Sequence, residues 1–177
     1  MFQINDTILY GADGVCVIAE IAKRTFGGKT QEYYVLKPVY SDQATIFVPT
    51  QNEKLLAKMR RILSEDEIYD MIQGMPEDEL LWIENENERK QAYGEIIRTG
   101  DRKAMVRLIK TLYLRQQDLK RNGKKFHACD ERFMKDAEKI LYHEFAHVLH
   151  MEPNQVQPFI LSRIQAQEQE QLKAVNT

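Results

Sequence analysis

The chain has 177 residues, of which 43% are hydrophobic and 29% charged, and its formal net charge at pH 7 is −2. This composition excludes an intrinsically disordered chain, and the length allows one domain or two small ones. Two cysteines are too few for a disulfide framework, and neither a signal peptide nor an apolar run of about 18 residues occurs, so we expect a cytoplasmic protein without membrane contact.

The first fifty residues have the pattern of short β-strands. Apolar and β-branched runs at residues 7–10, 14–25, 30–37 and 45–48 are separated by turn signals, the clearest being Gly27-Gly28-Lys29. Such strands predict a small, curled β-barrel over residues 1–52. A core of this size is marginal on its own, so we expect the barrel to pack on the segments that follow.

From Asn52 onward the apolar spacing is helical. It predicts a short helix over residues 53–61, a second from the Ser64/Glu67 capping box to Gly74, and an uneven helical segment from about Pro76 to Arg98. Three longer helices follow, from Asp101 to about Asn122, over 131–151, and over 154–174. Strands first and helices afterwards predict an α+β protein whose second domain, residues 53–177, is all-helical.

Charge is unevenly distributed along the helical part. Residues 76–88 contain six acids and no base, whereas residues 98–125 contain ten bases and two acids. On a helical wheel the side chains of Lys103, Arg107, Lys110 and Arg121 fall beside the apolar stripe, where they can neutralise phosphates. A solvated helix face explains the same pattern equally well.

His143-Glu144-Phe145-Ala146-His147 matches the H-E-x-x-H pattern of zinc hydrolases, in which two histidines bind zinc and the glutamate activates water. The helical wheel, however, places His143, His147 and His150 well away from the apolar stripe, on an outward face. No peptidase framework is evident around them. We therefore expect solvated histidines, no metal, no cofactor and no enzymatic activity, with a zinc hydrolase using His143, Glu144 and His147 as the alternative.

Five segments of the chain carry a recognisable pattern: Asp6–Gly11, Glu32–Lys37, Thr45–Pro49, Arg98–Asp101 and Gly123–Phe133. Together they resemble the CarD/CdnL family of bacterial transcription regulators, over nearly the whole chain to about Ile164, and the last segment is similar to the Firmicutes branch. The resemblance implies a Tudor-like (SH3-like) N-terminal barrel that docks on the β subunit of RNA polymerase. It also implies a helical domain that contacts promoter DNA at the upstream edge of the melted region, where a tryptophan wedge stabilises the open complex.

The resemblance also assigns residues by position. Arg24 and Phe47 are expected to contact polymerase, and Trp82 is the candidate wedge, although a core position is the other interpretation of a lone tryptophan among leucines. The expected DNA phosphate contacts are Arg89, Lys90, Lys124, Lys125 and Arg132. A monomer associated with the nucleoid through polymerase is expected. Because residues 77–88 are so acidic, a second alternative is an adaptor that docks on polymerase while its helical domain binds another protein.

Overall fold

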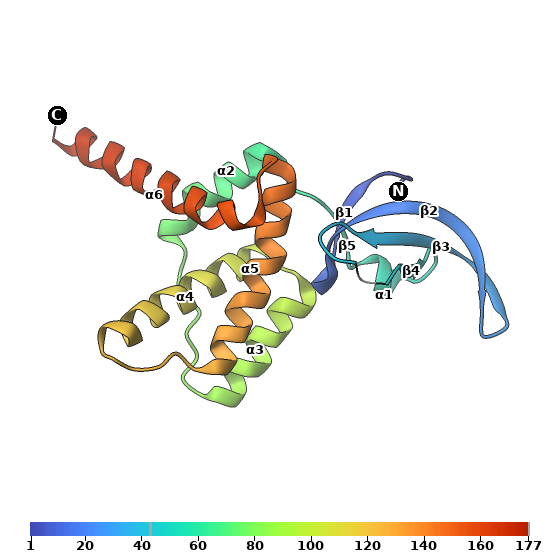
Figure 1. Cartoon of the computed structure of the whole chain (residues 1–177), viewed down its shortest axis with the longest axis horizontal. Coiled ribbons are helices and arrows are strands. Elements are labelled where there is room, and N and C mark those ends of the chain that lie inside the picture. The colour runs from blue at the N-terminus through green and yellow to red at the C-terminus, as the bar shows by residue number, and fades with distance from the viewer. Residues whose placement is uncertain (43, 177) are drawn as a thin grey trace. The chain divides into compact units, whose positions relative to one another are not determined.

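The computed structural model describes residues 1–42 and 44–176. They form two compact units: the first consists of Met1–Ile62 with Arg98–Gly100, and the second starts at Leu63 and contains the other described residues. The first unit holds the strands and the second holds the long helices (Figure 1). The expected fold class, α+β with a helical C-terminal part, is confirmed. Among the described residues, no helix has the length and apolar character needed to cross a membrane.

The first unit is built on one antiparallel sheet with strand order β4-β3-β2-β1-β5. The strands are β1 (Thr7–Tyr10), β2 (Gly14–Phe26), β3 (Lys29–Pro38), β4 (Ile46–Pro49) and β5 (Met59–Arg61). The long β2–β3 hairpin turns at Gly27 and Gly28, whose φ angles of 57° and 77° suit glycine. A register shift between Ile18 and Glu20 interrupts the ladder of β2, and β2 is strongly curved (Figure 1).

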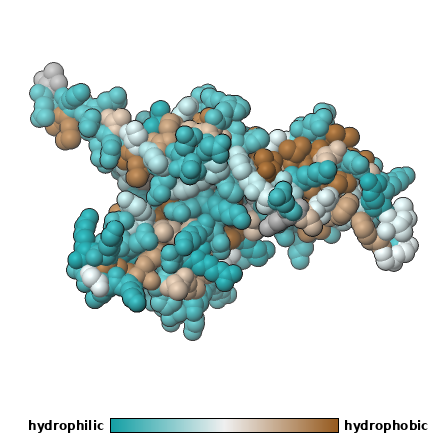
Figure 2. Space-filling view, viewed as in Figure 1, coloured by the Kyte–Doolittle hydropathy of each residue, from teal (hydrophilic) through white to brown (hydrophobic). Residues whose placement is uncertain are grey.

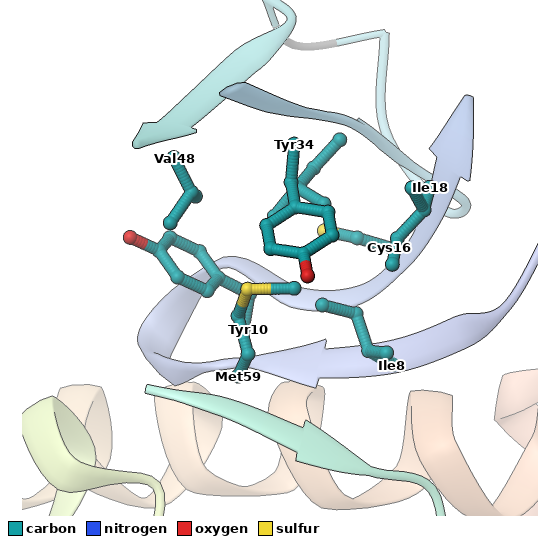
Figure 3. Close-up of a cluster of buried hydrophobic side chains, with 8 residues drawn as sticks. Ile8, Tyr10, Cys16, Ile18, Tyr34, Val48 and Met59 are labelled. Carbon is teal, nitrogen blue, oxygen red and sulfur yellow. The ribbon is translucent and has the colours of Figure 1, made fainter. Parts of the chain in front are cut away.

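Side chains from all five strands fill the core of this unit. They are Ile8, Tyr10, Cys16, Ile18, Tyr34, Leu36, Val48 and Met59, and most of them are visible in Figure 3. The alternation of side chains along β3 illustrates how each strand contributes. Tyr34 and Leu36 point into this cluster, whereas Tyr33 and Val35 lie on the opposite face of the strand. Burial in the core raises the pKa of the Cys16 thiol to about 12, so this cysteine behaves as a small apolar side chain.

Residues 53–61 are not one helix, contrary to the sequence-based expectation. Only α1 (Glu53–Leu56) is helical, with Asn52 as its N-cap, and Met59–Arg61 instead form the edge strand β5. This strand pairs with β1, matching Met59 with Tyr10 and Arg61 with Ile8. The sheet therefore extends to Arg61, and the first unit to Ile62, ten residues beyond the expected boundary at residue 52, because β5 pairs with the second edge of β1.

The second unit contains α2 (Glu65–Gly74), the short 3-10 turn η2 (Met75–Glu77), α3 (Glu86–Thr99, of which the last two residues belong to the first unit), α4 (Arg102–Arg121), α5 (Ala128–Leu149) and α6 (Pro153–Val175). The expected capping box is present, since the Ser64 hydroxyl accepts from Glu67 N and the Glu67 carboxylate accepts from Ser64 N. Asp101 caps α4 by accepting a hydrogen bond from Ala104 N. The largest helix contact is between α4 and α5.

The segment before α3 differs from the expected helix. After η2 the chain has no helical turn until Glu86, and residues 78–85 form an irregular stretch that we call the tryptophan strap. Two side chains hold its main chain: Leu81 N donates to the Thr111 hydroxyl, and the Tyr93 hydroxyl donates to Leu81 O, at 2.8 and 2.7 Å. These bonds replace those that a helix would make within itself.

Candidate functional site

The tryptophan strap lies along α4 and is attached to it by side chains. Lys110 Nζ donates to the carbonyls of Pro76 and Asp78, at 2.8 and 2.7 Å, and Arg107 Nε donates to Glu79 O at 3.1 Å. The sequence analysis left phosphate binding and a solvated helix face open for Lys110 and Arg107. In the structure both anchor the acidic segment that precedes them in the chain through its main-chain carbonyls. This leaves Lys103 and Arg121 as the exposed members of that group.

Trp82 lies further along the strap and is half-buried. Its indole Nε1 donates to the Glu84 carboxylate at 2.8 Å. Two guanidinium groups stack on the ring, with Arg89 Cζ 4.5 Å and Arg115 Cζ 4.3 Å from the ring centroid. The indole is therefore hydrogen-bonded at its edge and covered by two cationic side chains.

Arg89 is buried, with 6% of its surface exposed. Its Nε and Nη2 donate to the two oxygens of Asp130, at 2.9 and 3.2 Å, and its Nη1 donates to Ile83 O and Glu84 O. Every polar edge of the guanidinium has a partner inside the fold. Arg89, a candidate phosphate contact in the sequence analysis, thus positions Trp82 and the end of the strap.

The other predicted phosphate contacts remain at the surface. Lys90, Lys124, Lys125 and Arg132 are exposed, and Lys90 pairs with Glu86 on the same helix at 2.6 Å. The start of α5 lies beside the start of α3, because His127 Nε2 is 3.7 Å from Glu86 Oε1 and Asp130 binds Arg89. The structure therefore brings Trp82, Lys90 and the first turn of α5 to one end of the helical unit, with Lys124 and Lys125 in the connection just before it (Figure 1).

The first unit has an aromatic cluster in which the exposed rings of Phe26 and Phe47 contact the buried Tyr33. The rings meet edge to face, with centroids 5.3 Å apart for Phe26–Tyr33, 5.2 Å for Phe26–Phe47 and 6.2 Å for Tyr33–Phe47. Phe26 is 48% and Phe47 38% exposed, although each is large and apolar. Figure 2 shows apolar residues gathered on the surface of this unit.

Of the two residues assigned to polymerase binding, Phe47 belongs to the aromatic cluster. Arg24, the other one, lies on β2 close to the hairpin end and pairs with Glu20 at 2.6 Å while staying exposed. Phe26 and Tyr33 were not singled out by the sequence. The alternation along β3 could have indicated Tyr33, because this residue falls on the opposite face from the core residues Tyr34 and Leu36.

The H-E-x-x-H segment has a different role from the one its pattern suggests. Glu144 is 0% exposed, and its carboxylate accepts from Arg102 Nη2 at 2.6 Å, Arg102 Nε at 2.8 Å and Leu63 N at 3.0 Å. A carboxylate held in this way is not free to activate water. In the part of the chain that the structure describes, no three His, Cys, Asp or Glu side chains are placed to hold a metal ion. Burial, and then Lys139, lower the pKa of His143.

Arg102, Asp130 and Glu144 are functional in the fold but were missed in the sequence, although a signal was present. On the helical wheel of α5, Asp130 and Glu144 lie within the apolar stripe with Leu141, and Arg102 lies on the apolar side of α4. Charged residues inside apolar stripes of neighbouring helices indicate a buried ion pair. Arg115 gives no comparable signal, because its partner is the ring of Trp82.

Protein-family models match both parts of the chain. The model of the CarD-like/TRCF RID domain matches residues 2–63, and the model of the CarD C-terminal domain matches residues 67–160. Among curated proteins, the chain is similar to one described as "Putative transcription factor YdeB" from Bacillus subtilis strain 168. The two are 26% identical over 164 residues, which cover 90% of this chain and 99% of that protein.

Proposed function

This chain belongs to the CarD family of transcription factors, and from that premise we propose that it docks on the β subunit of RNA polymerase and stabilises the open promoter complex. The first unit supplies the polymerase contact and the second contacts DNA at the upstream edge of the transcription bubble. No cofactor is needed for either step, since both are binding events.

The observation that carries the proposal is how the Trp82 side chain is held in the fold. A half-buried indole is held by Arg89, which is itself fixed by Asp130, and exposed cations lie at the same end of the helical unit. An aromatic side chain that is fixed in place while partly exposed suits insertion at a base step, where unstacking costs a few kcal/mol and is offset by new contacts. The cations supply the phosphate contacts that a protein needs to stay on the duplex.

The aromatic cluster of the first unit supports the polymerase contact. Phe26 and Phe47 expose apolar rings that a water-facing surface does not need, and Tyr33 beneath them holds both rings in place. Aromatic side chains of this kind are enriched among the residues that dominate protein interfaces. Phe47 lies on β4, an edge strand of the sheet, so a partner strand could also pair with its main chain.

The test is the lifetime of the open complex formed by purified polymerase and a promoter, with wild-type protein, Trp82→Ala and the control Leu80→Ala. Leu80 lies on the same strap and is 52% exposed, so its truncation controls for local disturbance. We expect Trp82→Ala to shorten the lifetime while binding to closed duplex and its salt dependence stay nearly unchanged, because indole carries no charge. Thermal melting of each variant comes first. An unaltered lifetime in a folded Trp82→Ala protein would remove Trp82 from the proposed mechanism.

A further inference from the structure

The two arginines on the Trp82 ring are held very differently. Arg89 is buried, makes an ion pair with Asp130 through two hydrogen bonds, and donates to two carbonyls. Arg115, on α4, is half-exposed, and among residues 1–42 and 44–176 its guanidinium has no hydrogen bond or ion pair. Of the two guanidinium groups over the indole, one is therefore fixed in the fold and the other is held only by stacking.

The strength of that stacking decides what Arg115 can do. A cation over an aromatic face at an exposed site favours the stacked position by only about two- to fivefold over the free one. A phosphate can form two charge-assisted hydrogen bonds with a guanidinium, which is a stronger interaction than stacking on indole. Arg115 would thus exchange the ring for a phosphate if one came within reach.

The surroundings of Arg115 place it where a phosphate would be. Arg107, Thr111 and Arg115 follow one another at four-residue intervals along α4, on the side that faces the strap. Arg107 donates a hydrogen bond to the Glu79 carbonyl, and the Thr111 hydroxyl accepts one from Leu81 N. Arg115 is therefore the member of this row whose charged head faces Trp82 and solvent. DNA in contact with the indole would therefore lie close to the Arg115 guanidinium.

We propose that Arg115 is a further DNA-binding residue of this chain: it covers part of the Trp82 ring in the free protein and moves to a backbone phosphate when DNA binds. This inference rests on the proposed function, since it requires DNA at Trp82. The ring itself stays in place during the exchange, because Arg89 stacks on it and Glu84 holds its Nε1. The exchange uncovers part of the indole for a base, and it adds one phosphate contact.

Trp82 is the single tryptophan of the chain, so its fluorescence reports on this site without a label. In the full-length free protein, acrylamide quenching is compared between wild type, Arg115→Gln and the control Arg121→Gln, which removes the same charge from the last turn of the same helix. We expect the quenching constant to rise by about two- to fivefold in Arg115→Gln and to stay unchanged in Arg121→Gln. Equal quenching in wild type and Arg115→Gln would show that Arg115 does not cover the ring, and would overturn the proposal.

The DNA arm uses a duplex with a short unpaired stretch, titrated at several salt concentrations. Arg115→Gln should lower the slope of log K against log salt by about 0.9, the value for one lost phosphate contact on duplex DNA. Arg115→Lys keeps the charge but stacks poorly, so it should retain the wild-type slope and bind up to about two- to fivefold more tightly. A wild-type slope in Arg115→Gln would overturn the exchange while leaving the proposed function standing. Absence of DNA binding by the wild type would instead overturn the proposed function, and the exchange with it.

Discussion

The Arg89 guanidinium and the Asp130 carboxylate form a bidentate ion pair inside the helical unit, with Nε to Oδ1 at 2.9 Å and Nη2 to Oδ2 at 3.2 Å. Their side chains are 7% and 5% exposed. Arg89 also binds the carbonyls of Ile83 and Glu84 and stacks on Trp82. A single ion pair therefore connects the packing of α3 on α5 with the placement of the proposed DNA-contacting ring.

Replacing Asp130 by Asn should destabilise the protein strongly, because Arg89 would keep its charge in a buried site without a counter-charge. Breaking a buried pair in this way typically costs about 3–5 kcal/mol. The matched control is Glu131→Gln, one residue further along α5, which breaks only the surface pair with Lys135 and should change stability by less than about 1 kcal/mol. Urea unfolding measures both, and similar losses in the two variants would contradict the buried role of Asp130.

Replacing Phe47 by Asp should abolish binding to the polymerase β subunit, because a carboxylate would be desolvated in a mostly apolar contact. The matched control is Val39→Asp, which introduces the same charge at a similarly exposed apolar residue outside the aromatic cluster. Co-purification of the β subunit with each folded variant gives the result. Wild-type binding by Phe47→Asp would move the interface away from the aromatic cluster.

Replacing both Lys124 and Lys125 by Gln should weaken DNA binding about equally for all sequences. Each lost phosphate contact should lower the salt slope by about 0.9 on duplex DNA. Both residues are exposed in the connection before α5, so the melting temperature should stay close to that of the wild type. Fluorescence anisotropy with two unrelated duplexes tests the prediction. A loss confined to one sequence would indicate base recognition instead.

Replacing Glu144 by Gln should destabilise the protein by several kcal/mol, on the order of 3–5, since Arg102 would lose its buried partner. The outward face that the sequence analysis assigned to His143, His147 and His150 does not include the buried Glu144. The loss should be the same with EDTA and with added zinc, because Arg102 and not a metal binds the carboxylate. One zinc equivalent retained through dialysis of untagged protein, measured by elemental analysis, would restore the hydrolase alternative.

Acidification should reduce stability through His143. Burial lowers the pKa of this residue in the folded protein, whereas the unfolded chain has the ordinary value of about 6.5. The unfolded state therefore binds more protons, and stability that is present above about pH 6.5 is lost as the pH falls below it. Unfolding free energies at roughly pH 7.5 and 5.5 should differ less in His143→Gln than in the wild type. An identical difference in both proteins would assign the pH dependence to other groups.

Local patterns in the sequence were sufficient for much of this fold. Strand alternation with the Gly27-Gly28 turn, the Ser64/Glu67 capping box and the Asp101 cap predict their elements correctly, because each depends on residues close together in the chain. The edge strand β5 could not be predicted in this way. Met59–Arg61 is a strand because β1 lies beside it, and that pairing joins segments far apart in the sequence.

The candidate site shows the same division between local and distant information. The sequence locates Trp82 and the basic residues of α4, but the roles of these residues depend on what packs against them. Lys110 would be a free cation on an isolated helix, yet it binds the carbonyls of Pro76 in η2 and Asp78 at the start of the strap. Arg89 looks like a surface residue between acids until Asp130, on another helix, is placed beside it. Net charge along the chain therefore indicated the region of the site and not its contacts.

The two buried acids of α5 have a consequence for how this protein can change over evolution. Asp130 is fixed by Arg89 near one end of the helix, and Glu144 by Arg102 near the other. Inserting one residue between them would rotate one carboxylate by about 100° around the helix axis and shift it by about 1.5 Å, so one of the two arginines would lose its partner. We therefore expect single-residue insertions between Asp130 and Glu144 to destabilise the protein. The exposed connection at residues 122–127 should tolerate an insertion.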